Sequence, residues 1–528
     1  MPRTRRSRIW LASGVVLLAA VVLVVAAAVA VGPLGSNHLR RRLAAALGAH
    51  LEGEVEIASL RARMWPRFEV AADGLVVRHR GRRDVPPLIV VRSVAVEASL
   101  LDVLRRHVRL VTLSGLEIHV PPDHYRDGAA DGDRGTTDAA NTHTATSTRG
   151  RAIVVDTLVT NDAQLSIIPR EPAKPPRVWA IHRLRMQSVA FDRAMPFEAA
   201  LANAVPPGEI GVQGSFGPWQ AGKPGQTPLE GTFTLARADL GVFKGISGIL
   251  SAHGEFGGVL GRIGIHGETD TPRFVVAVGG HPVPLHADYH ATVDGTNGDT
   301  ILDQIDGSFL GTRLVAKGRV VETAGRMGRT VALDVTMDHA RLEDVLRLAA
   351  KAARPPMTGA LELKTRFVLP PGDRDVVEKL RLDGEFAVAR VTFTNIDVQH
   401  KVNELSHRSR GRAPAVKPDS VVSNFRGRFR LREATLGLDG LTFDMPGARV
   451  RLSGTYGLKP GRLDFKGLLS MDAKLSETQR GFKRLLLKAI DPFFKGKGGG
   501  SAIPIKIEGS RRAPSFGLDK GRVFKRGT

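Results

Sequence analysis

A two-residue alternation of apolar and polar side chains runs through most of this 528-residue chain. The clearest case is Phe425–Arg432, in which Phe425, Phe429 and Leu431 share one parity and four arginines hold the other. Successive side chains of a β-strand point to opposite faces, so this pattern predicts a strand with one apolar and one solvated face. No helix separates those two sets of residues. We therefore predict a mainly β fold, an elongated and curled antiparallel sheet with few short helices.

The alternation predicts further strands that contain residues 116–120, 361–367, 463–471 and 503–508. Pro504 in the last of these suits an edge strand, because proline cannot donate a ladder hydrogen bond. The tripeptide Gly-x-Phe also recurs, and we interpret its glycine as a bulge or tight entry at a strand start. Chance in a chain with 58 glycines is the alternative explanation. The copies are residues 214–216, 231–233, 254–256, 307–309, 384–386 and 427–429, with Gly454-Thr455-Tyr456 as a relative.

Helical periodicity is confined to short stretches. These are residues 36–51, 99–106, 240–252, 341–353, 398–408 and 477–490. The last stretch places Arg480, Lys483, Arg484 and Lys488 around an apolar stripe. We predict that this basic helix faces an anionic membrane or a partner, with an end cap over the last strands as an equal alternative.

One long apolar segment, residues 9–32, carries no charge. About twenty apolar residues span the roughly 30 Å hydrocarbon core of a bilayer, so we predict a single-pass anchor. Arginines precede the segment, which favours a cytoplasmic location for residues 1–8. A cleaved signal peptide is the competing interpretation, because residues 28–30 match a small-x-small site, although signal cores run only about 7–15 residues. The candidate anchor residues are Ile9, Trp10, Leu17, Leu23 and Val31.

A polar stretch divides the remainder of the chain. Residues 123–150 have no apolar period, and we predict a disordered loop. This loop separates an N-terminal portion, residues 33–122, from a body of residues 151–528, and we expect both to lie on the far side of the membrane.

Charge and residue chemistry narrow the function classes. The net charge is +23, yet the arginines are spread along the whole chain and aromatic residues make up only 5%, so we expect no nucleic-acid partner. There is no cysteine, and His281, His286 and His290 do not all share one strand face, so we expect no zinc site. We interpret Asp373 and Asp375 as solvated turn residues. No catalytic motif is present, and we expect neither an enzyme nor a cofactor.

The apolar side of such a sheet needs a cover, and the few short helices are too small to supply it. A curled sheet that holds acyl chains in a groove satisfies this need, because each buried methylene contributes about 0.8 kcal/mol. Candidate groove-lining residues follow from parity alone. They are Leu116, Ile118, Leu363, Phe367, Phe386, Val388, Phe429, Leu431, Val450, Leu452, Phe465 and Ile505.

The two ends of the chain resemble the AsmA-like proteins of Gram-negative envelopes. At the start, an apolar segment and a short helix precede Val55-Glu56-Ile57, the Met64–Arg67 step and the region 87–111. The C-terminal region, about residues 380–528, carries further motifs in the family's order. They are Leu438–Phe443, Met445–Ala448, Leu452–Tyr456, Ala473–Ser476 and Ile503–Ile507.

The resemblance implies an inner-membrane-anchored periplasmic protein with a β-taco body, similar in plan to TamB and to eukaryotic bridge-like lipid transfer proteins. It implies phospholipid as a partner, with transport toward the outer membrane and support of outer-membrane assembly. Another envelope protein or a second copy is a further expected partner. The alternative is a structural or assembly scaffold that affects protein targeting to the outer membrane without carrying lipid.

Overall fold

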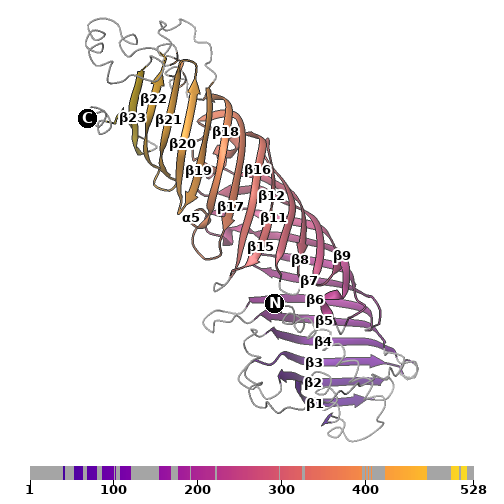
Figure 1. Cartoon of the computed structure of the whole chain (residues 1–528). Helices are drawn as coiled ribbons and strands as arrows, with labels where there is room; N and C mark the ends of the chain where they lie inside the picture. Colours follow the sequence, from indigo (N-terminus) through magenta and orange to yellow (C-terminus); the bar gives the residue numbers. More distant parts are fainter. Residues whose placement is uncertain are drawn as a thin grey trace, which may run out of the picture. The chain divides into compact units, whose positions relative to one another are not determined.

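The computed structural model describes most of the chain beyond residue 52 (Figure 1). The described residues are 53–63, 68–79, 86–99, 107–120, 154–167, 177–190, 192–220, 223–295, 298–323, 328–394, 423–472, 501–510 and 513–519, with Arg40, Arg41, Ala44, Asp102, Gln399, Val402, Asn403 and Ser406. The predicted anchor, the loop 123–150 and the basic helix 477–490 lie outside them. None of the helices within the described part is both long and apolar enough to cross a membrane.

The described chain is mainly β, as the alternation predicts, and it divides into two compact units. Unit 1 comprises Met1–Ala238, Ser251–Gly267 and Thr292–Asp299. Unit 2 comprises Asp239–Leu250, Glu268–Ala291 and Thr300–Thr528.

Unit 1 is a sheet whose strands pair in chain order. Its strands are β1 (Gly53–Arg63), β2 (Phe68–His79), β3 (Ile89–Ala98), β4 (His107–Val120), β5 (Val154–Ile167), β6 (Arg177–Val189), β7 (Met195–Ala204), β8 (Pro207–Phe216) and β9 (Pro228–Asp239), with a 3₁₀ turn η2 (Pro224–Gln226) and most of β11 (Ile249–Val259). Pairing is antiparallel from β1 to β4 and again from β5 to β9.

One pair departs from the predicted antiparallel order, because β4 and β5 are parallel. His107 pairs with Val154 and Val120 with Ile167, so both strands run the same way over their whole length. A parallel pair needs a connection of a dozen or more residues, and residues 121–153 supply that length. The polar stretch therefore joins two neighbouring strands of one sheet.

The interior of β1 to β6 is filled by its own side chains. Val91, Val111 and Val155 have no exposed surface, and they belong to one cluster of buried aliphatic residues drawn from all six strands. Val189 of β6 is also 0% exposed. A two-residue apolar period places such residues at alternate positions on one face of a strand, where they pack against one another.

Unit 2 is built mainly of consecutive strands, many of which are labelled side by side in Figure 1. Its elements are η3 (Leu240–Val242), β10 (Ile246–Ser247), parts of β12 (Arg262–Val276) and β13 (Val283–Val293), then β14 (Thr300–Phe309), β15 (Thr312–Glu322), β16 (Arg329–Arg341), α4 (Leu342–Ala349), β17 (Met357–Leu369), α5 (Val376–Lys379), β18 (Arg381–Phe393), β19 (Ser423–Arg432), β20 (Thr435–Met445), β21 (Ala448–Gly457), β22 (Arg462–Met471), β23 (Ser501–Ser510) and β24 (Ala513–Leu518). Every pairing from β14 to β24 is antiparallel.

The strand predictions are confirmed, with one change at Pro504. The five predicted strands lie within β4, β17, β19, β22 and β23. However, β23 is not an edge strand, since it pairs with both β22 and β24. The carbonyl of Pro504 accepts a hydrogen bond from the N–H of Asp519, one residue beyond the last β24 pair. Pro504 therefore lies just beyond the last residue pair of β23 and β24, where its missing N–H removes no hydrogen bond between paired strand residues.

The helix predictions are only partly confirmed. The stretch 341–353 contains α4, but the predicted helix 240–252 is wrong: it forms the turn η3 and then strand residues. Asp239 caps this turn by accepting from the N–H of Gly241. Gly245 and Gly248 then have φ of 97° and 142°, which no α-helix accommodates. The helical spacing of apolar residues in 240–252 did not reveal that these glycines end the helical conformation.

Candidate functional site

The apolar face of unit 2 is organised in rows that cross the strands. Residues paired in register from β16 to β22 form the first, which we name the α5-side row because it lies toward the strand ends next to α5. Its members are Leu333, Phe367, Leu382, Leu431, Leu436, Tyr456 and Leu463. A second, the α4-side row, consists of Ala340, Leu361, Val388, Phe425, Phe443, Val450, Leu469 and Ile503.

The two rows differ in how completely they are covered. Within the α4-side row, Phe425 and Phe443 stack with ring centroids 4.5 Å apart, and Ala340, Leu361 and Val388 are buried. In the α5-side row only Leu431 is buried, and the other six side chains remain partly accessible. The α5-side row is therefore an apolar surface that the described residues of unit 2 cover incompletely.

Glycines lie between these rows, on the same face. Gly384 and Gly454 occupy one register line, and Gly467 lies on the next. A Cβ at Gly454 would overlap the carbonyl oxygen of Asp464 and lie 2.6 Å from the Cα of Phe465. A Cβ at Gly467 would likewise overlap the carbonyl oxygen of Arg451. Neighbouring backbone thus crowds this face at mid-strand, as it does on the inside of a bend.

The Gly-x-Phe copies explain this arrangement, although not at strand starts as predicted. In β18 and β19, Gly384 pairs with Phe429 and Phe386 pairs with Gly427, so each ring lies opposite a glycine. The two phenylalanine ring centroids are 6.2 Å apart. Pairing an aromatic ring with a cross-strand glycine shields the backbone that glycine leaves bare. In this strand pair the tripeptide allows close backbone approach, and Gly427 also lies at a register shift, as the bulge interpretation predicts. The copies 214–216 and 307–309 lie at the ends of β8 and β14.

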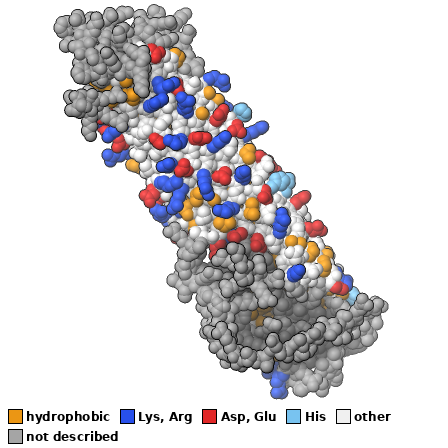
Figure 2. Space-filling view, viewed as in Figure 1, with side chains coloured by type: hydrophobic (Ala, Val, Ile, Leu, Met, Phe, Trp, Pro, Cys, Tyr) orange, Lys and Arg blue, Asp and Glu red, His pale blue; other side chains and the backbone are white. Residues whose placement is uncertain are grey.

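The opposite face of unit 2 is polar, and its charges alternate in sign. Register places one such row in the order Lys317, Asp334, Arg366, Asp383 and Arg430. The Nε of Arg430 lies 3.3 Å from a carboxylate oxygen of Asp383. Figure 2 shows cationic and anionic side chains interspersed over this part of the molecule. The positive charge is thus distributed among ion pairs over this face.

The predicted lining residues occupy several environments. Leu116 is buried in the core of unit 1, and Ile118 packs against that core. Those in unit 2 share the apolar face. Val388, Phe429, Leu431 and Phe465 are buried, whereas Leu363, Phe367, Phe386, Val450, Leu452 and Ile505 are partly accessible. The predicted anchor residues and the basic residues 480–488 lie outside the described part of the chain.

The two ends of the strands of unit 2 meet at one place. α4 and α5 follow the antiparallel neighbours β16 and β17, so they lie at opposite strand ends. Lys244 lies on the α4 side. It precedes β10, which pairs with the end of β12. The turn that follows β12 packs at Gly279 against Leu348 of α4. The N–H of Val376 in α5 nevertheless donates to the carbonyl of Lys244 at 2.7 Å.

A cavity of about 480 Å³ lies beside this contact. Ala277, Val278 and Lys351 line it from the α4 side. From the α5 side it is lined by Asp375, Leu458, Lys459, Pro460, Gly461 and Ser510. Lys459 in the β21–β22 turn forms ion pairs with Asp375, at 3.1 Å, and with Glu378. The sequence did not predict these contacts, because Lys459 and its partners Asp375 and Glu378 are more than eighty positions apart and form no local pattern.

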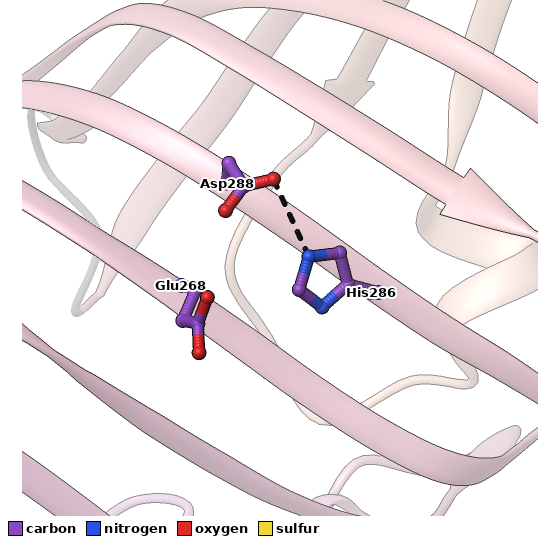
Figure 3. Close-up of side chains that lie close together, drawn as sticks. All are labelled: Glu268, His286 and Asp288. Atoms are coloured by element: carbon purple, nitrogen blue, oxygen red, sulfur yellow. Dashed lines mark hydrogen bonds and ion pairs between the residues drawn. The ribbon is translucent and has the colours of Figure 1, made fainter.

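One group of side chains has the composition of a metal site. Glu268 on β12 and His286 and Asp288 on β13 have ligand atoms within 4.8 Å of one another (Figure 3). The Nδ1 of His286 lies 2.8 Å from a carboxylate oxygen of Asp270, and its Nε2 lies 3.3 Å from Asp288. The bond to Asp270 raises the pKa of His286, and Asp288 adds to the effect. An imidazolium held by carboxylates accounts for the cluster.

His286 and His290 lie on β13 and His281 precedes it, so the three do not share one strand face, as predicted. His286 has carboxylates as its hydrogen-bonding partners, and the signal for them is the alternation Glu268-x-Asp270 facing His286-x-Asp288. Asp375, interpreted from the sequence as a solvated turn residue, instead caps α5 by accepting from the N–H of Val377 at 2.9 Å.

Comparison with known proteins gives no assignment: no family model, no curated protein and no solved structure matches this chain.

Proposed function

We propose that this chain is an AsmA-like periplasmic protein, anchored in the inner membrane, that holds acyl chains against the apolar face of unit 2. In this role it supports phospholipid transport to the outer membrane and outer-membrane assembly. The observation that carries the proposal is the α5-side row, a line of large apolar side chains most of which stay partly accessible, on a sheet whose opposite face is polar and rich in charge.

The contrast between β1–β6 and the strands of unit 2 supports an apolar guest. In β1 to β6 the same alternation ends in a core of aliphatic residues at 0–8% exposure. In unit 2 the equivalent positions of β17 to β22 are mostly covered only in part. An acyl chain that buries ten methylenes there contributes about 8 kcal/mol of favourable transfer free energy.

The glycines between the two apolar rows support a groove rather than a flat surface. Gly384, Gly454 and Gly467 remove Cβ atoms from the apolar face where neighbouring backbone comes closest. A sheet bent toward that face brings its two sets of strand ends together over it, and the contact between Val376 and Lys244 fits such a bend. A curled sheet of this kind is a trough sized for hydrocarbon chains.

Site-specific photo-crosslinking tests the proposal. A photoreactive side chain at Leu452, on the apolar face, should capture phospholipid in cells, whereas the same group at Arg451, one residue away on the charged face, should not. Mass spectrometry of the purified full-length chain identifies the adduct. Equal capture at both positions, or none at Leu452, would contradict a lipid groove.

A structural scaffold is the second candidate function, and the filled core of β1 to β6 favours it. A scaffold of this kind keeps its interior for its own side chains and binds other envelope proteins. The crosslinker at Leu452 would then join positions within the chain, and the crosslinker at Arg451 would capture a protein.

A further inference from the structure

The contact between the two sides of unit 2 is made by a short segment that we name the strap, residues 370–380. It contains α5 and joins the end of β17 to the start of β18. Its connection to the α4 side is the hydrogen bond from the N–H of Val376 to the carbonyl of Lys244. Next to it, a Cβ at Gly245 would overlap the Oδ1 of Asp375 and lie 2.8 Å from its Cγ. Only glycine at position 245, with φ of 97°, allows this approach.

A second set of bonds holds the strap from the α5 side. Lys459 pairs with Asp375 and Glu378, and these three side chains are 43%, 22% and 34% exposed. Lys379 donates to the carbonyl of Gly372 within the strap. Ion pairs with this much solvent contact are weak and are screened by salt. Besides these bonds the strap has one buried side chain, Val377 of α5, at 4% exposure. All of these contacts can break while the strands of unit 2 stay paired.

We propose that the strap is a latch on the lipid groove: closed, it bridges the two sides of unit 2 over the apolar face, and released from Lys244 it opens a lateral path for an acyl chain. This inference rests on the proposed function. Because the strap contacts Lys244, between η3 and β10, on one side and the β21–β22 turn on the other, it joins segments far apart in the chain.

A disulfide across the contact tests the latch directly. A backbone N–H···O bond of 2.7 Å places Lys244 and Val376 close enough for a cysteine pair, and the chain has no cysteine of its own to interfere. The variant K244C/V376C of the full-length chain in polymer discs would be given vesicles that contain a fluorescent phosphatidylethanolamine. We expect the oxidised form to load at least tenfold more slowly than its reduced form, with recovery after dithiothreitol.

The matched control is K317C/D334C, a pair directly opposite each other on the polar face of β15 and β16. Its disulfide should leave the loading rate unchanged. Equal rates for oxidised and reduced K244C/V376C would overturn the latch and leave the groove standing. A reduced variant and an unmodified chain that both fail to take up the probe would instead overturn the proposed function.

A charge reversal gives an independent measurement. In Lys459→Glu the new carboxylate repels Asp375 and Glu378, so the strap should release and loading should become several-fold faster. High salt should accelerate the unmodified chain but not this variant. Lys466→Glu, an exposed change on the polar face of β22, is the control and should load at the unmodified rate. Slower loading in Lys459→Glu than in this control would contradict the latch.

Discussion

At the scale of single residues, Asp344 shows how unit 2 fixes α4. This aspartate is 5% exposed and accepts hydrogen bonds from the N–H of Gly311, at 3.0 Å, and from the hydroxyl of Thr312, at 2.9 Å. The same hydroxyl oxygen accepts from the N–H of Arg341 at 3.0 Å, so one carboxylate organises the β14–β15 turn and the helix start. The sequence predicted the helix but not this role, because the partners lie about thirty residues away.

Replacing Asp344 by alanine should therefore destabilise unit 2. The change leaves the N–H of Gly311 and the buried hydroxyl of Thr312 without their acceptor, which typically costs about 1–3 kcal/mol. Urea denaturation of the full-length chain measures the effect. Asp338→Ala, at an exposed position of β16, is the control and should change stability by less than about 0.5 kcal/mol. Equal losses would show that the carboxylate of Asp344 has no special role.

At the scale of elements, strand identity follows from side-chain alternation, but strand bending does not. The pattern in β19 predicts its two faces correctly because parity is a local property. The same pattern cannot show that Gly384 will face Phe429, since that pairing depends on register across a 29-residue connection between β18 and β19. The Gly-x-Phe copies were visible in the sequence, yet their placement at mid-strand required the pairing.

Gly454 provides a test of the bend. Alanine there would overlap the carbonyl oxygen of Asp464, so β21 and β22 must move apart or flatten. We expect a loss of about 1–3 kcal/mol, the usual penalty for overpacking. Thermal unfolding measures it, and Gly517→Ala is the control because nothing lies within 4 Å of its Cβ position. A stability equal to that of the control would contradict backbone crowding at Gly454.

At the scale of the whole molecule, side-chain alternation predicted a mainly β chain and the spread of arginines predicted a dispersed positive charge, and both are observed. It did not predict the parallel pair β4–β5 or the division into two units. The candidate apolar face was predictable by parity from residues such as Leu363 and Leu452. The degree of coverage was not, because burial of Leu116 in a solid core depends on contacts between distant strands.

The difference between the filled core of β1 to β6 and the partly covered face of β16 to β22 predicts an uneven response to lipid. A ligand stabilises the regions that it contacts, so added phospholipid should slow amide hydrogen exchange in β16 to β22. Peptides from β1 to β4, whose interior is already filled, should exchange at an unchanged rate. Exchange measured by mass spectrometry with and without lipid gives both values in one experiment. Uniform protection of both regions, or protection confined to β1 to β4, would contradict the assignment of the lipid to unit 2.

The parallel pair has a consequence for how the chain assembles. From β1 to β4, from β5 to β9 and from β14 to β24, each strand pairs antiparallel with the strand that precedes it in the chain, so it can add directly to that strand. β5 is parallel to β4, so its first residue, Val154, pairs with the first residue of β4, His107. The connection 121–153 must therefore close a long loop before these two strands can pair. We expect this loop closure to be the slow step of folding. Until β5 pairs, β4 is an edge strand with unpaired N–H and C=O groups, which can form hydrogen bonds with a strand of another molecule and lead to aggregation.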